Sequence, residues 1–166
     1  MRELAPPPNA FIVVNGRRWR TSDAHIPETF RQELVNELMA ARRAVRHAQS
    51  DGAMRTARRR VNDAKVALGE RGYAWWLPPD PVATGRRVEA AIMALLRSRR
   101  SGASICPSDV ARIVGGETWR AMLPVVRERA VKMSARGRID ILRRGRVVKE
   151  NPTAGVLRYR LTRAPR

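Results

Sequence analysis

Basic side chains crowd into seven residues near the C-terminus: Arg143, Arg144, Arg146 and Lys149. One acid, Glu150, ends the run. Guanidinium groups make paired hydrogen bonds to phosphate and to guanine, and an ammonium group binds phosphate as a point charge. A loop that carries no core residues can use such charge for phosphate or minor-groove contacts. The alternative is a loop whose charge only keeps the protein in solution.

A second basic set lies in the long helical pattern that precedes this loop. On a helical wheel, Arg120 and Arg127 lie on one edge of the face opposite the apolar stripe, and Lys132 and Arg136 lie on the other edge. Because this helix follows a tight turn, its basic face is a candidate for contact with a polyanion. An ordinary solvated face is the alternative.

The helix that begins after Cys106 offers a candidate phosphate site. Its backbone N–H groups would point at an anion, and Ser108 could add a hydroxyl. Arg86 and Arg87 could flank the site. They lie in the first turn of the preceding helix, predicted over residues 85–99, where a positive charge opposes the helix dipole and favours an anionic partner. A simple charged first turn is the alternative.

Residues suited to enzymatic chemistry are sparse. The two histidines, His25 and His47, lack the spacing of metal ligands. Cys106 is the single cysteine, has no candidate base near it in the sequence, and is expected to cap a helix or join the core. We therefore expect no enzyme activity, no metal and no cofactor.

The composition indicates a polyanionic partner. The 166 residues include 34 Lys and Arg against 15 Asp and Glu, a net charge of +19. Thirty-one of these cations are arginine, and residues 77–166 carry +13 of the total. Genomic base composition could explain the preference for arginine over lysine, but it does not explain the net charge. A small, strongly basic protein points first to nucleic acid.

Targeting signals are not evident. The first ten residues are Pro-rich and do not resemble a signal peptide, and no run approaches the roughly 20 apolar residues of a membrane span. We expect a cytoplasmic protein without a membrane partner, associated with the nucleoid if it binds DNA.

The first half of the chain, residues 1–72, predicts a β-hairpin followed by a helical hairpin. Strands over residues 11–14 and 17–21 would flank Asn15-Gly16, the strongest two-residue hairpin signal. Apolar residues spaced by three and four predict a helix over residues 27–49 and, after a break at Ser50-Asp51-Gly52, a second helix. The two helices would pack antiparallel, as a homodimer interface or as a further basic surface.

Residues 73–84 predict a linker, because they combine two tryptophans with three prolines. Two adjacent tryptophans, Trp75 and Trp76, are unlikely to stay in water. We expect at least one of them to dock on a neighbouring domain.

The last part, residues 85–166, predicts a winged helix-turn-helix, which makes the chain an α+β protein. Helices are expected over residues 85–99, 106–114 and 117–136, and Ile105 is expected to form a short first strand. Pro124 should kink or split the third helix. Strands over residues 139–142 and 156–161 would enclose a wing over residues 143–155.

This last part also resembles a known family. Residues 104–112 (SICPSDVAR), 115–120 (GGETWR), Pro124 and 137–139 (GRI) are similar to the motifs of an uncharacterised bacterial winged-helix domain. The resemblance covers residues 86–161; it implies the fold and makes Pro124 a family trait, but it implies no ligand. Residues 64–72 (AKVALGERG) and the tryptophan pair resemble an actinobacterial-type helical-hairpin module of unknown function.

Together these observations favour binding of double-stranded DNA by a small regulator or nucleoid-associated protein. RNA or ribosome binding is the alternative within the same class. A winged helix that serves as a protein-interaction module is the alternative from another class.

Overall fold

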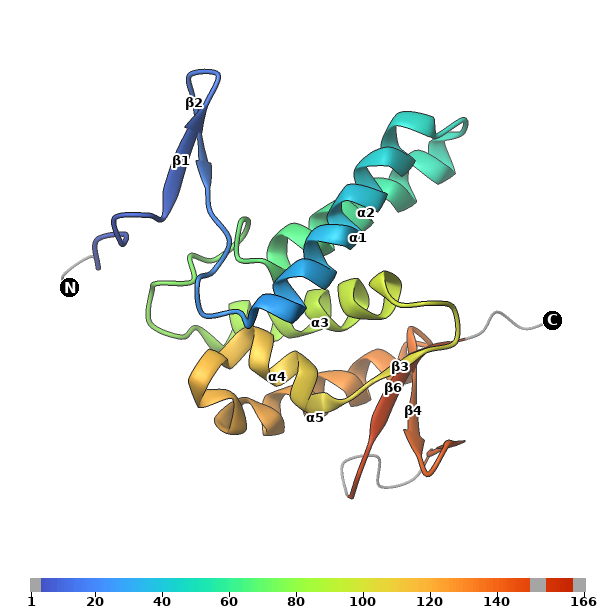
Figure 1. Cartoon of the computed structure of the whole chain (residues 1–166). Helices are drawn as coiled ribbons and strands as arrows, with labels where there is room; N and C mark the ends of the chain where they lie inside the picture. Colours follow the sequence, from blue (N-terminus) through green and yellow to red (C-terminus); the bar gives the residue numbers. More distant parts are fainter. Residues whose placement is uncertain (1–3, 150–154, 163–166) are drawn as a thin grey trace.

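The computed structural model describes residues 4–149 and 155–162. Within these residues the chain forms five α-helices, one 3₁₀-helix and two antiparallel sheets (Figure 1). The predicted α+β class is confirmed. No helix in the described residues has an apolar stretch long enough to cross a bilayer.

The N-terminal hairpin pairs β1 (Phe11–Val14) with β2 (Arg17–Arg20), and Val14 lies opposite Arg17. Asn15 and Gly16 both have positive φ, 50° and 73°, which is the type I′ turn that the Asn-Gly pair predicts. An isolated two-stranded hairpin is only marginally stable. This one is held at its base, where the ring of Phe11 packs edge-on against Trp76 at 5.5 Å between centroids.

The helical hairpin consists of α1 (Glu28–His47) and α2 (Asp51–Ala67). The expected break at residues 50–52 is the start of α2, because the Ser50 side chain accepts a hydrogen bond from the Ala53 N–H at 3.1 Å. Leu34, Leu38 and Ala41 of α1 are buried, as are Ala57 and Ala64 of α2. The three-and-four spacing of apolar residues thus marks the buried faces.

Helix α3 (Pro81–Ser98) begins four residues earlier than the sequence predicts. Asp80 caps it, accepting a hydrogen bond from the Ala83 N–H at 2.7 Å, and Pro81 occupies the first helical position. Residues 81–84 are therefore helical and do not belong to a linker. Arg86 and Arg87 lie beyond the first turn, so they do not oppose the helix dipole as the sequence suggested.

The connection between the two halves docks on the N-terminal hairpin and the loop after it. Trp75 lies edge-on to His25 at 5.7 Å between centroids, and Trp75 and Trp76 contact each other at 5.3 Å. Both tryptophans are half-buried. The expectation that the pair docks on neighbouring structure agrees with these contacts.

Three elements follow α3 before the C-terminal strands: β3 (Ser104–Ile105), α4 (Pro107–Gly115) and, after the 3₁₀ turn η1 (Gly116–Thr118), helix α5 (Trp119–Ala135). Pro124 lies inside α5 without dividing it, so the predicted split does not occur. It stands in the second turn of the helix and is exposed to solvent. The ring therefore costs one backbone hydrogen bond but displaces no core residue.

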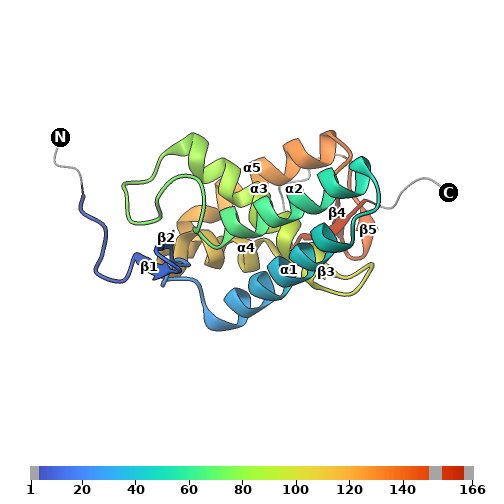
Figure 2. The same cartoon turned by 90° about the horizontal axis from the view of Figure 1, so that it is seen from above.

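The second sheet has the strand order β3-β6-β4-β5, with every pair antiparallel. It contains β4 (Ile139–Arg143), β5 (Arg146–Val147) and β6 (Arg158–Leu161). Ile139, Ile141 and Tyr159 point into the core. The short strand β5 was not predicted: the first residues of the expected wing fold back on β4 as a tight hairpin. From above, this sheet and the β1-β2 hairpin lie at opposite ends of the molecule (Figure 2).

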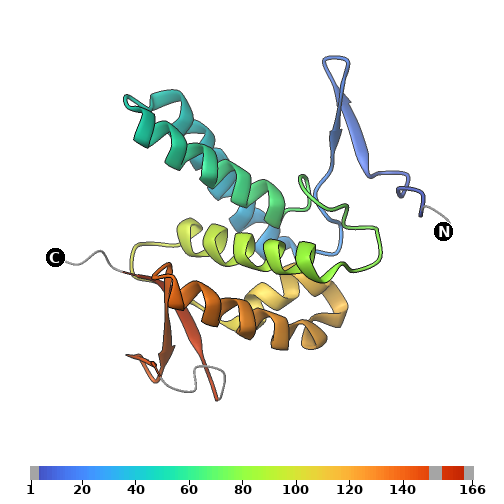
Figure 3. The same ribbon diagram turned by 180° about the vertical axis from the view of Figure 1, so that it is seen from behind.

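One hydrophobic core extends from Ile26 to Tyr159 and joins both halves of the chain, apart from the β1-β2 hairpin. Helix α3 lies at its centre, with α1 and α2 on one side and α4 and α5 on the other (Figures 1 and 3). Leu34 and Leu68 from the first half join Val88 and Ile92 of α3 and Val126 of α5 in this core. The predicted division at residues 73–84 therefore separates two sequence modules that share a core.

Substitution of a central α3 residue should destabilise both halves together. Leu95 is fully buried, so we expect Leu95→Ala to lower the free energy of unfolding by about 2–5 kcal/mol. The exposed Val82 on the same helix is the control, and Val82→Ala should stay within about 0.5 kcal/mol of the native protein. Urea unfolding followed by circular dichroism and tryptophan fluorescence should give one coincident transition. Two separate transitions would contradict the shared core.

Candidate nucleic-acid interface

The β4-β5 hairpin presents most of the predicted wing cations to solvent. Arg144, Arg146 and Lys149 are exposed, and within the described part of the chain they have no hydrogen bond or ion pair through their side chains. Arg143 differs because it is half-buried. Its Nε lies close to Gly155, 3.7 Å from the point that a Cβ would occupy if Gly155 had a side chain. Three of the four predicted wing cations are thus available to a partner.

The turn of this hairpin places an arginine in a strained conformation. Arg144 and Gly145 have positive φ, 51° and 78°, the same pair of conformations as Asn15 and Gly16 in the first hairpin. Asparagine tolerates the left-handed region, whereas a long side chain such as arginine is disfavoured there. Such a conformation persists where the surrounding structure fixes it, here the tight turn between β4 and β5. Arg144 is therefore the wing cation that the fold holds in a disfavoured backbone conformation.

The predicted cations of α5 do not form one surface. Arg127 is half-buried beside Tyr159: burial raises the pKa of the Tyr159 hydroxyl far above its usual range, and the Arg127 charge opposes that shift. Lys132 is exposed but forms an ion pair with Glu128 at 2.5 Å. Arg136 is exposed at the end of the helix, next to the sheet. Of the four predicted cations, only Arg136 and the distant Arg120 have no hydrogen bond or ion pair of their side chains among the described residues.

Arg120 belongs to a cluster at the opposite end of α5. Its guanidinium lies 4.5 Å from the centroid of the Trp119 ring, and the guanidinium of Arg112, from α4, lies 4.9 Å from the same ring. Both arginines are exposed. Arg112 was not predicted as a site residue, since no regular spacing connects it to Trp119 across the α4-α5 turn.

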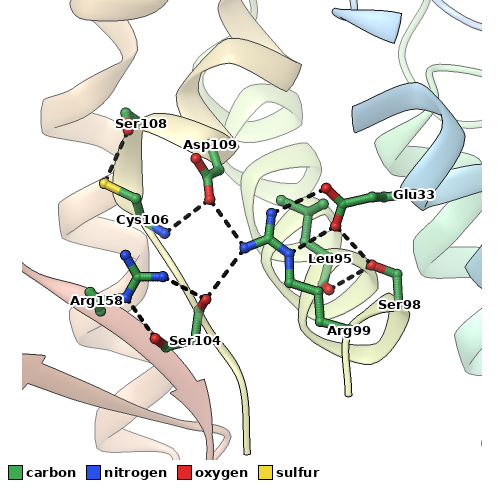
Figure 4. Close-up of polar contacts among 9 residues, drawn as sticks. All are labelled: Glu33, Leu95, Ser98, Arg99, Ser104, Cys106, Ser108, Asp109 and Arg158. Carbon is green, nitrogen blue, oxygen red and sulfur yellow. Dashed lines mark hydrogen bonds and ion pairs between the residues drawn. The ribbon is translucent and has the colours of Figure 1, made fainter. Parts of the chain in front are cut away.

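The expected phosphate site at the start of α4 holds a carboxylate of the protein itself (Figure 4). Asp109 Oδ2 accepts a hydrogen bond from the Cys106 N–H at 3.1 Å and lies 3.4 Å from Arg99 Nη1. The Ser108 hydroxyl donates to Cys106 Sγ at 3.0 Å, so it is directed at a neighbour within the chain. Ser108 therefore has a structural contact, and an external anion would have to compete with Asp109.

Arg86 and Arg87 differ in their surroundings although they are adjacent. Arg87 Nη2 lies 2.8 Å from Asp23 Oδ2, its Nε donates to the Ala67 carbonyl at 3.3 Å, and its side chain is 14% exposed. Arg86 is exposed and has no side-chain partner among the described residues. The geometry makes Arg87 part of the junction between the two halves and leaves Arg86 to solvent.

Within the described ranges, no three His, Cys, Asp or Glu side chains come close enough to bind a metal ion. Cys106 is a half-buried free thiol.

Comparison with known proteins finds a family model that matches most of the C-terminal half. Residues 85–162 match the family described as a protein of unknown function, DUF3253. The match runs from the second turn of α3 to the end of β6 and includes every motif quoted for the resemblance to an uncharacterised family. That resemblance is confirmed. No curated protein matches the chain.

The two adjacent arginines should respond differently to substitution. Asp23 is 6% exposed, and Arg87→Ala leaves its Oδ2 without an ion pair while Oδ1 keeps its contacts with the His25 backbone N–H and Nδ1, so the change should cost about 1.5–3 kcal/mol of unfolding free energy. Arg86→Ala should change that free energy by less than about 0.5 kcal/mol. Urea unfolding of the two variants measures both values. Equal effects would contradict the structural role of Arg87.

Proposed function

We propose that residues 81–162 form a winged helix that binds double-stranded DNA, mainly through the cations of the β4-β5 hairpin. The observation that carries the proposal is the exposed set Arg144, Arg146 and Lys149 at the tip of the sheet, whose side chains have no partner among the described residues. The described elements follow the order helix, strand, helix, helix, strand, strand, with a hairpin inserted at the wing. That is the order of a winged helix, in which the wing lies beside the DNA-contacting helix.

Most acidic residues of the C-terminal half form contacts away from the wing, which supports the proposal. Of the six acids described after residue 76, five cap a helix or pair with a cation. These are Asp80, Glu89, Asp109, Glu128 and Asp140. Only Glu117 has no such contact in the part of the chain that the structure describes. No acid in the described part of this half therefore neutralises Arg144, Arg146 or Lys149, and their charge acts on the surroundings.

We expect weak sequence preference. Sequence is read by polar side chains that reach base edges, whereas phosphate contacts carry no sequence information. The outward stripe of α5 contains Ala121, Pro124 and Ala135, together with the Glu128–Lys132 pair. This stripe offers few free groups for base contacts, so most of the affinity would come from phosphates and would fall steeply with salt.

A salt titration tests the contribution of the wing. For Arg144→Ala/Arg146→Ala, affinity for a short duplex should fall, and the slope of log K against log salt should become shallower by about 1.8, which is 0.9 for each lost phosphate contact. Arg55→Ala/Arg59→Ala is the control, since it removes the same charge from exposed positions of α2. Fluorescence anisotropy gives both quantities. The proposal fails if the wing variant binds like the control.

Structured RNA serves as a competitor in the same titration. If RNA displaces the duplex at far lower concentration than unlabelled duplex does, the RNA-binding alternative is favoured. If no nucleic acid binds even at low salt, the protein-interaction alternative remains.

The strained turn allows stability and binding to be separated. Arg144→Asn replaces a disfavoured residue by one suited to the left-handed region, and should raise the free energy of unfolding by roughly 1 kcal/mol. The same change removes a wing cation and should weaken duplex binding. Arg146→Asn is the control, because it removes a charge at an extended position and should not stabilise. Urea unfolding and anisotropy together check the pair; a destabilised Arg144→Asn variant would contradict the argument from strain.

A further inference from the structure

A second basic surface lies on the helical hairpin. Between α1 and α2 the surface is hollowed into a groove of about 720 Å³, whose floor is formed by Met39, Val45 and Val61. Its remaining lining is entirely arginine: Arg42, Arg43, Arg46, Arg58 and Arg71. Cations from both helices and from the loop after α2 thus surround one apolar floor.

These arginines have no acid to neutralise them. Arg42, Arg43, Arg46 and Arg58 are exposed, and no hydrogen bond or ion pair of their side chains occurs within residues 4–149 and 155–162. Arg71 donates to the neutral Asn62 side chain at 3.1 Å. The structure therefore does not use the charge of the groove internally.

Arg60 of α2, close to the groove residue Arg58, is by contrast an arginine with a structural role. It makes a two-point contact with Glu37 at 2.8 and 2.9 Å, and that hydrogen-bonded carboxylate raises the pKa of the Arg60 guanidinium. Glu37 is fully buried. In contrast, residues 40–60 contain only one acid, Asp51, and it does not line the groove.

The positive field of the groove extends toward the N-terminal hairpin. Burial is the main cause that lowers the pKa of the Lys65 ammonium, and the charges of Arg42, Arg71 and Arg17 lower it further against the opposing effect of Glu70. The Lys65 ammonium also lies 5.0 Å from the centroid of the Trp19 ring. Cations of α1, α2, the following loop and β2 therefore act on the same region.

The groove and the wing lie on different sides of the molecule. The helical hairpin packs on one face of α3, and α4 and α5 pack on the other (Figures 1 and 3). No residue of α3, α4, α5 or the second sheet lines the groove. A straight duplex that contacts the wing and α5 would leave the groove open.

We propose that the arginine groove between α1 and α2 binds a second segment of duplex DNA, so that one molecule bridges two duplexes. The second half of this statement rests on the proposed function of the wing. Charge identifies the ligand of the groove. Arg42, Arg43 and Arg46 lie at i+3 and i+4 spacings on α1, and Arg58 lies on the antiparallel α2, so the groove suits a ligand with regularly spaced phosphates. A homodimer through this face, one of the roles expected for the helical hairpin, would bring the arginines of two copies together without acids between them.

Bridging is measured by capture of one duplex by another. A short duplex is fixed on beads, the protein is added, and recovery of a labelled duplex of unrelated sequence is recorded. We expect the native protein to capture it. Arg42→Ala/Arg46→Ala should reduce capture at least about tenfold, because two phosphate contacts are lost. The matched control is Arg55→Ala/Arg59→Ala, which removes an i, i+4 arginine pair from the partner helix outside the groove.

The outcomes separate this inference from the proposed role of the wing. Bridging is supported if the groove variant still binds the fixed duplex, folds like the native protein and loses capture of the second duplex. It is overturned if the groove variant captures like the control, or if sedimentation shows that capture requires a dimer. It is also overturned if a polyglutamate peptide binds in a groove-dependent manner and duplex DNA does not. If wing substitution leaves all binding intact while groove substitution abolishes it, both the wing proposal and bridging fail.

Discussion

The structure depends on the burial of α3 on both of its faces. Nine of its residues are buried, including a continuous run from Ala90 to Leu96. A helix that is apolar nearly all round must be covered on all sides, and here α1 and α2 cover one side while α4 and α5 cover the other. Three ion pairs connect α3 and its C-terminal cap to the N-terminal module. Arg87 pairs with Asp23, Arg97 with Asp63 and Arg99 with Glu33. The family domain and the N-terminal module therefore meet through both apolar and charged contacts of a single helix.

These ion pairs also determine where the excess positive charge is found. The chain has 15 acids for 34 basic residues, and many of its acids hold arginines at junctions between elements. The carboxylates are thus concentrated where elements meet, and few remain near the tip of the sheet or the outer face of the helical hairpin. Among the described residues, a polyanion that approaches either surface meets arginines that no carboxylate holds. The same interactions that stabilise the fold create the two candidate DNA surfaces.

The sequence predicted the elements more accurately than their limits or their roles. Asn15-Gly16 identified the first hairpin, and apolar spacing identified the helices, because these signals act within a few residues. The start of α3 was misplaced because Thr84, which directly precedes the predicted helix, and Asp80 are both of residue types that cap helices, and only the fold selected Asp80. Strand β5 was missed since Arg144-Gly145 is an unusual pair for a tight turn. Arg87 and Ser108 were predicted to bind an anion, but both have partners within the protein.

The sequence by itself determined the α+β class, the order of the α-helices and of every strand except β5, the family resemblance within residues 85–162 and the large positive charge. Those properties depend on composition, local spacing and short motifs. Only the tertiary structure decided which arginines are held and which are presented to a partner. Arg87 and Arg99 find carboxylates 64 and 66 residues away, at Asp23 and Glu33, while Arg42 and Arg144 find none among the described residues. An ion pair requires two charges to meet in space, and that meeting is fixed by how α3 packs between its neighbours.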